Sequence, residues 1–115
     1  MKEIIEKLRA FADERDWAQY HSPKNLAMAL SVEAAEIVEH FQWLTQAQSY
    51  GMDADKLAAV REEIGDVLIY LAMLSDKLGI DPFQAAMDKI EKNKKKYPAS
   101  IVRGQAKKYK EYKES

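Results

Sequence analysis

Residues 67–74 read Val-Leu-Ile-Tyr-Leu-Ala-Met-Leu, a run without any charged side chain. The run lies inside a segment that begins with a capping residue, Asp53, and ends at Gly79, which predicts one long helix. A helix that is apolar around its whole circumference has to be covered on every side. Short partner helices from a chain of 115 residues would hardly cover it. The sequence therefore predicts a helical bundle that a second subunit completes, with a tight monomeric bundle as the alternative.

Two shorter helices are expected ahead of this one. Residues 2–15 carry apolar side chains at a 3.6-residue period, which is typical of an amphipathic helix. Ser22 has the side chain of a helix N-cap, and Pro23 suits the first helical position because the N–H that it lacks would be unpaired there anyway. The second helix is therefore expected to begin at Pro23 and to run to about Phe41 or Leu44.

A fourth helix is expected after Asp81 and Pro82, which repeat the combination of a cap and a proline, and it should stop before Pro98. The chain has no alternation of apolar and polar residues of the kind typical of strands. The expected fold class is therefore all-α, a four-helix bundle completed by oligomerisation. We expect one domain over residues 1–98 and a basic, irregular C-terminal tail over residues 99–115.

The basic residues are unevenly placed, although the net charge of −1 argues against a general nucleic-acid binder. Ten of them follow position 88, namely Lys89, Lys92, Lys94, Lys95, Lys96, Arg103, Lys107, Lys108, Lys110 and Lys113. The simplest interpretation is a solvated helix end and tail. The alternative function is a non-catalytic helical interaction module whose basic end binds nucleic acid or an acidic protein.

The composition excludes several classes of site. The chain has no cysteine, so disulfides, thiolate metal sites and cysteine nucleophiles are excluded. No apolar run has the length of a membrane span, and residues 1–8 mix charged and apolar side chains, unlike a signal peptide. We therefore expect a soluble, cytoplasmic protein without membrane contact.

Two pairs of acids have a spacing that places both members on one helix face. Glu33 and Glu36 lie three residues apart among apolar neighbours, and Glu63 and Asp66 directly precede the apolar run. Glu62 should point away from the second pair. The spacing itself is common on exposed helices, so a solvated acidic surface is the simplest alternative.

Carboxylates in apolar surroundings need a compensating charge. No lysine or arginine lies between positions 25 and 52, and only Arg61 lies between positions 57 and 76, so ion pairs within these helices cannot neutralise four acids. A divalent cation can, and oxygen ligands favour Mg²⁺, Mn²⁺ or Ca²⁺. Because Mg²⁺ completes its shell with substrate phosphates, the pattern indicates phosphoryl chemistry. A di-iron bundle is excluded because it needs a histidine three residues after an acid, and neither histidine has this spacing. Paired carboxylates of the glycosidase type are also conceivable, but they need two acids and this pattern has four.

Six motifs extend from these acids over nearly the whole chain. They are Arg15-Asp16-Trp17, His21-x-Pro23-x-Asn25-Leu26, Glu33-x-x-Glu36, Phe41-Gln42-Trp43, Glu62-Glu63-x-x-Asp66-Val67-Leu68-Ile69-Tyr70-Leu71 and Asn93-x-x-x-Tyr97-Pro98. With them the chain resembles the MazG-like all-α nucleoside triphosphate pyrophosphohydrolases, and within that family the dCTP pyrophosphatase-like branch. The two acidic motifs are moderately specific by themselves and strongly indicative together with the aromatic and Asn-Tyr-Pro elements.

The resemblance implies that Glu33, Glu36, Glu63 and Asp66 are the catalytic ligands of Mg²⁺, which Mn²⁺ can replace. In this family the metal organises the triphosphate, and a metal-associated water attacks the α-phosphorus, releasing pyrophosphate and a nucleoside monophosphate. A dedicated side-chain base is not implied.

The resemblance also implies where the substrate binds. The residues that match the family's nucleotide pocket are Trp17, His21, Trp43 and Tyr70. Those that match its phosphate-binding residues are Asn93 and Tyr97, and Lys89 and Lys96 on the same helix are further candidates. For the two tryptophans and the tyrosine, packing at the edge of the core is the alternative.

The expected function is hydrolysis of dCTP or a related pyrimidine deoxynucleoside triphosphate as nucleotide-pool house-cleaning. The expected assembly is a homodimer or, by resemblance, a homotetramer. No specific binding of nucleic acid is expected.

Overall fold

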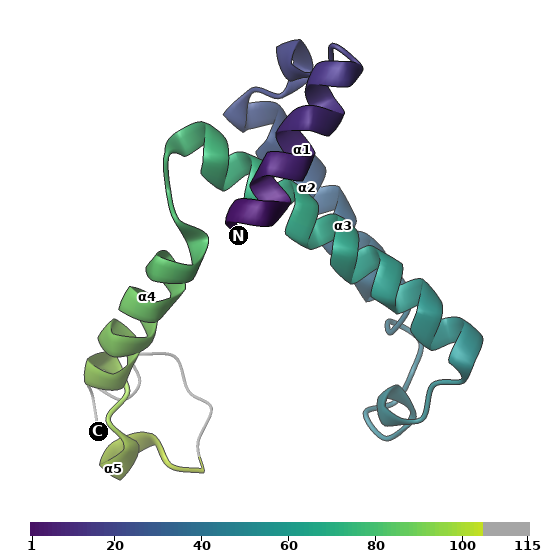
Figure 1. Ribbon diagram of the computed structural model, residues 1–115. Helices are drawn as coiled ribbons and strands as arrows, with labels where there is room; N and C mark the ends of the chain where they lie inside the picture. The colour runs from purple at the N-terminus through teal and green to yellow at the C-terminus, as the bar shows by residue number, and fades with distance from the viewer. Residues whose placement is uncertain (105–115) are drawn as a thin grey trace. The chain divides into compact units, whose positions relative to one another are not determined.

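The computed structural model describes residues 1–104, which fold into helices and turns without a strand. The chain divides into two compact units, residues 1–80 and the residues that follow. The first holds α1 (Lys2–Glu14), α2 (Pro23–Glu39) and α3 (Ala54–Leu78), and the second holds α4 (Pro82–Lys96) and α5 (Ala99–Val102) (Figure 1). None of these helices combines the length and the apolar character that crossing a membrane requires. The all-α fold class is confirmed.

The long helices begin where the sequence provides a cap. The side chains of Ser22, Asp53 and Asp81 each accept a hydrogen bond from a backbone N–H two or three residues further on, at 3.1, 2.8 and 2.9 Å. α3 ends at Gly79, whose φ of 65° is the left-handed conformation that glycine adopts without strain. These three starts and this end agree with the prediction because cap signals are local.

The end of α2 differs from the prediction. The helix ends at Glu39 instead of continuing to Phe41 or Leu44. The N–H groups of His40 and Phe41 donate to carbonyl oxygens three residues back, at 3.1 and 2.9 Å, so the chain leaves the α-helical pattern there. Residues 40–44 form turns, which place the second tryptophan outside the helix.

The expectation that the chain is irregular from residue 99 onward is wrong for its first residues. α5 is a single helical turn, in which the N–H groups of Ile101 and Val102 donate to the carbonyl oxygen of Pro98 at 2.9 and 3.0 Å. A proline suits the position before such a turn because it leaves no N–H unpaired. Residues 105–115 of the predicted tail lie outside the described residues.

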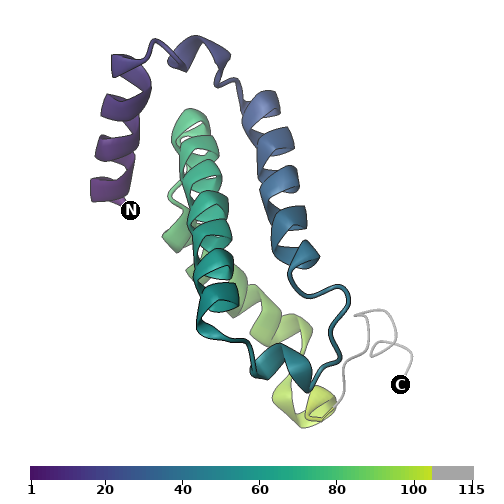
Figure 2. The ribbon, with the colours of Figure 1, turned by 90° about the vertical axis from the view of Figure 1, so that its right-hand side faces the viewer.

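α3 packs against both other helices of the first unit. In Figure 2, α3 lies between α1 and α2, and it runs antiparallel to α2. The buried apolar side chains come from all three helices: Ala12 from α1, Leu26 from α2, and Val60 and Ala72 from α3. The interface between α2 and α3 therefore brings two helix faces together that are far apart in the sequence.

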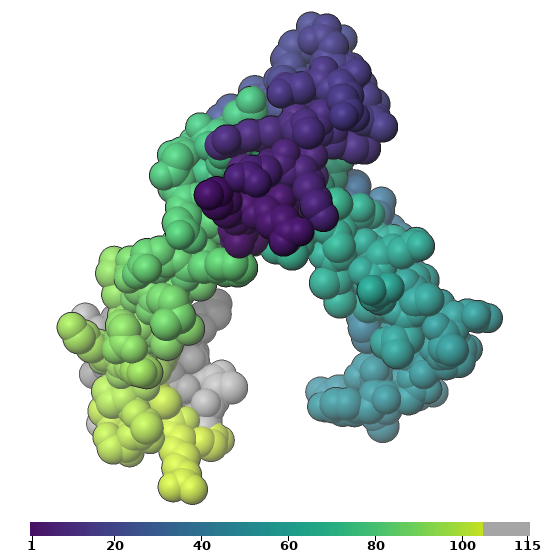
Figure 3. All heavy atoms as spheres, in the orientation of Figure 1, coloured from purple at the N-terminus to yellow at the C-terminus, as the bar shows by residue number. Residues whose placement is uncertain are grey.

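An ion pair attaches α1 to α3. Arg9 Nε donates to Asp76 Oδ2 at 2.9 Å, and the guanidinium holds the pKa of Asp76 below its ordinary range. Figure 3 shows α1 lying across part of α3 and leaving the N-terminal part of α3 uncovered on this face. α1 is thus placed to form one wall of the space beside the C-terminal half of α3.

Candidate functional site

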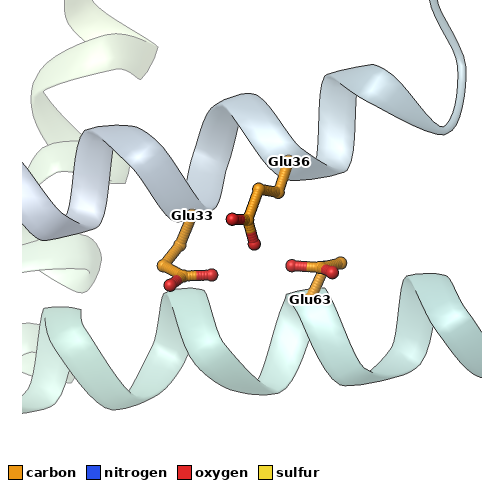
Figure 4. Close-up of side chains that lie close together, drawn as sticks. All are labelled: Glu33, Glu36 and Glu63. Carbon is orange, nitrogen blue, oxygen red and sulfur yellow. The ribbon is translucent and has the colours of Figure 1, made fainter.

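Three carboxylates converge between α2 and α3. Glu33 and Glu36 extend from α2 toward Glu63 of α3 (Figure 4). One carboxylate oxygen from each residue lies within 4.8 Å of those from the other two. Two acids three residues apart share a helix face, so the packing of that face on α3 is what adds Glu63 to the pair. We call these three residues the carboxylate cluster.

The carboxylates of the cluster disfavour one another's negative charge. Hydrogen bonding to Glu36, burial, and the charges of Glu36, Glu33 and Asp66 raise the pKa of Glu63 from 4.5 to about 7. Hydrogen bonding to Glu36, burial, and the charges of Glu36 and Asp66 also raise the pKa of Glu33. Without a cation, the cluster therefore retains protons at a pH where isolated glutamates have lost them.

The cluster has the features expected of a site for a hard cation. Oε2 of Glu33 and Oε2 of Glu63 are buried and have no hydrogen-bond partner. Within residues 1–104, no lysine or arginine forms an ion pair with Glu33, Glu36, Glu63 or Asp66. Unpaired buried carboxylate oxygens are unfavourable unless a cation binds them, and an oxygen-only donor set suits Mg²⁺ or Mn²⁺. These residues thus fit a divalent metal ion.

The raised pKa of Glu63 predicts how stability depends on pH without metal. Between pH 4.5 and about 7 the folded protein binds a proton that the unfolded chain has released. Stability should therefore fall as the pH rises through this window. The lowered pKa of Asp76 makes stability rise with pH, but only below the ordinary aspartate pKa of 3.8. We expect the melting temperature in EDTA to decrease from about pH 5 to about pH 8, and this slope to become shallower in Glu63→Gln. A melting temperature that rises over this range would contradict the assignment.

Asp66 joins the carboxylate cluster to a cavity. It lies one turn after Glu63 on α3, and its charge contributes to the raised pKa of both Glu63 and Glu33. It is not one of the three carboxylates that lie within 4.8 Å of one another. Instead it lines a cavity of about 410 Å³, which is within the size range of small-ligand pockets.

Three of the predicted nucleotide-binding residues line the same cavity. They are Trp17 and His21 from the segment between α1 and α2, and Tyr70 from α3. Trp17 is 46% exposed, so part of its ring is accessible to a ligand. The structure thus brings an aromatic surface and a carboxylate together in one space.

Local contacts fix the segment that carries Trp17 and His21. The N–H of Trp17 donates to Ala12 of α1 at 2.9 Å, and its ring meets the Phe11 ring edge-on at 5.7 Å between centroids. At the other end, Asn25 Nδ2 donates to the carbonyl oxygen of Tyr20 at 3.0 Å. These contacts bind the segment to both flanking helices and keep the first tryptophan at the cavity.

Trp43 does not share this position. It lies in the turns after α2, its side chain is 86% exposed, and it is absent from the residues that line the cavity. Its role at the nucleotide stays a prediction.

The predicted phosphate-binding residues belong to the second unit. Lys89, Asn93 and Lys96 are exposed on α4, and Tyr97 follows the helix as its half-buried C-cap. The carbonyl oxygen of Asn93 accepts a hydrogen bond from the N–H of Tyr97 at 2.7 Å. The ammonium group of Lys96 lies 5.6 Å from the centre of the Tyr97 ring. Their approach to phosphates stays a prediction.

Sequence reasoning missed two groups of residues at the site. Lys7, Leu8 and Phe11 of α1 line the cavity opposite α3, a placement that follows from tertiary packing and leaves no signal in the sequence. His40 places Nε2 3.9 Å from Oε1 of Glu63. A signal for His40 existed, because it follows Glu36 by four residues and helical spacing puts both on one face.

The chain has clear relatives among known proteins. The model of the MazG-like family matches residues 28–112. The chain is 42% identical over 112 residues to dCTP pyrophosphatase 1 of Homo sapiens and 43% identical over 110 residues to that of Mus musculus. These alignments cover 95% and 93% of this chain but 66% and 65% of those proteins, so the chain spans slightly less than two thirds of their length.

A solved structure is similar over most of its length. The crystal structure of a pyrophosphatase from Archaeoglobus fulgidus superposes with a TM-score of 0.81 at 45% sequence identity. The match covers 85% of this chain and 92% of the archaeal chain. Fold, family model and sequence identity agree, and the chain belongs to the MazG-like family.

Proposed function

We propose that this protein is a Mg²⁺-dependent hydrolase that cleaves nucleoside triphosphates between the α and β phosphates, releasing a monophosphate and pyrophosphate. The observation that carries the proposal is the junction of the carboxylate cluster with the aromatic cavity through Asp66. A nucleotide has a flat base at one end and a polyanion at the other, and this junction offers a matching surface to each. The relatives named as dCTP pyrophosphatases and the archaeal pyrophosphatase support the same reaction.

In this proposal the residues of the cavity bind and orient the nucleoside. The Trp17 ring provides a surface on which a base stacks, and such stacking contributes about 1–3 kcal/mol per base. His21 and the Tyr70 hydroxyl supply hydrogen-bonding groups on the cavity wall. The walls from α1 and α3 exclude water from the nucleoside, while the phosphates extend past Asp66 toward the carboxylate cluster.

The carboxylate cluster and Asp66 hold the metal in this proposal. When bound, a divalent cation neutralises phosphate charge and increases the acidity of water at neutral pH. Glu33 and Glu63 would contribute the buried oxygens that lack a partner, and Asp66 would lie between these ligands and the nucleoside. Four carboxylates thereby become compatible with a substrate that is itself strongly negative.

We further propose that the substrate is dCTP or a related pyrimidine deoxynucleotide, hydrolysed as nucleotide-pool house-cleaning. The names of the curated relatives support this choice. We expect kcat/KM for dCTP to exceed that for purine deoxynucleotides by at least about tenfold. Trp17→Ala should raise the KM for dCTP by about tenfold or more through lost stacking. The matched control is Tyr50→Ala, which removes a 92% exposed aromatic ring that does not line the cavity. A uniform or purine-led profile would refute the base preference.

We propose that the protein is a homodimer or a homotetramer. Leu57, Ile64, Leu71 and Leu78 recur every seven residues on α3, and their exposures are 59, 55, 38 and 53%. A seven-residue apolar repeat forms one stripe along a helix, and burying it against a second copy is favourable. We expect light scattering to give a mass of at least twice 13.2 kDa. A monomer at every concentration would contradict this assembly.

A further inference from the structure

His40 lies beside Glu63 of the carboxylate cluster and has no role in the proposed reaction. Glu33 and Glu36 lie on α2, and His40 is its C-cap, so the three occupy positions i, i+3 and i+7, which share one face of a helix. This face packs on α3, where Glu63 is located. The side chains of His40 and Glu63 are 20% and 22% exposed, so both lie mostly within the interface between the helices.

The distance between the His40 ring and the Glu63 carboxylate bears on whether one cation can contact both. Nε2 of His40 lies 3.9 Å from Oε1 of Glu63, which is too long for a hydrogen bond. Two donor atoms on one octahedral cation, each about 2.1 Å from the metal, lie about 3.0 Å apart if adjacent and about 4.2 Å apart if opposite. The observed distance falls between these values. A cation bound at Glu63 can therefore contact both atoms once the side chains shift slightly, although His40 is not among the groups that all lie within 4.8 Å of one another.

We propose that His40 supplies a nitrogen donor to the metal centre and makes it selective for transition-metal cations such as Co²⁺ over Mg²⁺. The proposal rests on the proposed function, because it assigns a property to the same metal site. Carboxylate oxygens alone suit Mg²⁺, whereas imidazole nitrogen preferentially stabilises Co²⁺ and the later divalent metals. His40, at the end of α2, would thus add one nitrogen donor to a site that otherwise consists of carboxylate oxygens.

The backbone allows this side chain to be replaced without disturbing the helix. His40 is the C-cap of α2 with φ −73° and ψ −18°, an ordinary right-handed conformation that does not depend on the identity of the side chain. Its N–H donates to the carbonyl oxygen of Ile37 at 3.1 Å, a bond that a substitution leaves in place. His40→Gln exchanges the nitrogen donor for an amide oxygen, and His40→Leu removes the donor. His21→Gln changes the chain's other histidine, which lines the cavity, and serves as the matched control.

The test is calorimetric titration of Mg²⁺ and Co²⁺ into each purified variant, without nucleotide and at a fixed pH of 8. We expect His40→Gln and His40→Leu to weaken Co²⁺ binding by about tenfold or more while Mg²⁺ binding changes by less than about threefold. His21→Gln should change neither. Pulsed electron paramagnetic resonance of bound Mn²⁺ should detect a coupled nitrogen in the parent protein and none in His40→Gln.

Three results would overturn the proposal. Equal losses for both cations, or no loss for either, would show that His40 is not a selective donor, while Mg²⁺ binding by the parent protein would leave the proposed function intact. Failure of the parent protein to bind either cation would refute the metal site and this inference together. Circular dichroism of each variant verifies that the helices are retained, and the parent spectrum tests nitrogen ligation without any substitution.

Discussion

Glu63→Gln and Asp66→Asn are each expected to lower kcat by roughly a thousandfold or more while leaving the helices intact. A metal-assisted phosphoryl transfer depends on several kcal/mol of charge stabilisation, and each 1.36 kcal/mol corresponds to about a tenfold change in rate. Glu63 contributes a buried, unpartnered oxygen to the carboxylate cluster, and Asp66 joins the cluster to the cavity. Neither substitution changes side-chain size appreciably. Steady-state kinetics with dCTP, together with circular dichroism, measures both parts of the expectation.

The neighbouring acid provides the control for these variants. Glu62 is exposed and adjacent to Glu63 on the same helix, so Glu62→Gln removes one negative charge without touching the cluster. We expect its kcat to remain within about threefold of the parent value, as for most surface substitutions. Without metal, Glu63→Gln should melt no lower than the parent protein because it removes a repelling buried charge. Full activity in Glu63→Gln would show that the site is wrongly assigned.

The local part of this structure could be predicted from the sequence. Ser22, Asp53 and Asp81 act as caps through bonds to residues two or three positions away, so each signal lies within a few residues of its effect. The end of α2 could not be predicted as well, because the change to i−3 hydrogen bonds after Glu39 has no distinct residue signal. The single turn of α5 was missed because a four-residue helix has no period to detect.

The site was predictable only in part, because its residues come together through the packing of helices that are distant in the sequence. The spacing of Glu33 and Glu36 places both on one face, but the approach of Glu63 depends on how α2 packs on α3. Likewise, the helical period does not reveal that Asp66 faces a cavity while Glu63 joins the cluster, although they are three residues apart. The wall that α1 contributes to the cavity depends on contacts such as the ion pair of Arg9 with Asp76, which are 67 residues apart.

Removal of divalent cations is expected to abolish turnover completely and to weaken nucleotide binding as well. A triphosphate approaching Asp66 and the carboxylate cluster meets charges of its own sign, and like charges a few ångströms apart repel strongly in a partly buried site. EDTA should therefore eliminate activity, and excess Mg²⁺ or Mn²⁺ should restore it. Titration with a non-hydrolysable dCTP analogue should give a dissociation constant at least about a hundredfold higher in EDTA than in Mg²⁺. Unchanged analogue affinity in EDTA would contradict a metal-dependent site.

The central claim is that this site directs water to the α-phosphorus of a nucleoside triphosphate, and hydrolysis of dCTP in H₂¹⁸O tests it most directly. Mass spectrometry of the products, with Mg²⁺ present, reports both the bond that is cleaved and the phosphorus that is attacked. We expect dCMP and pyrophosphate in equal amounts, with one ¹⁸O atom in dCMP and none in pyrophosphate. Formation of dCDP and orthophosphate, or ¹⁸O in the pyrophosphate, would show that the reaction takes place at a different phosphorus.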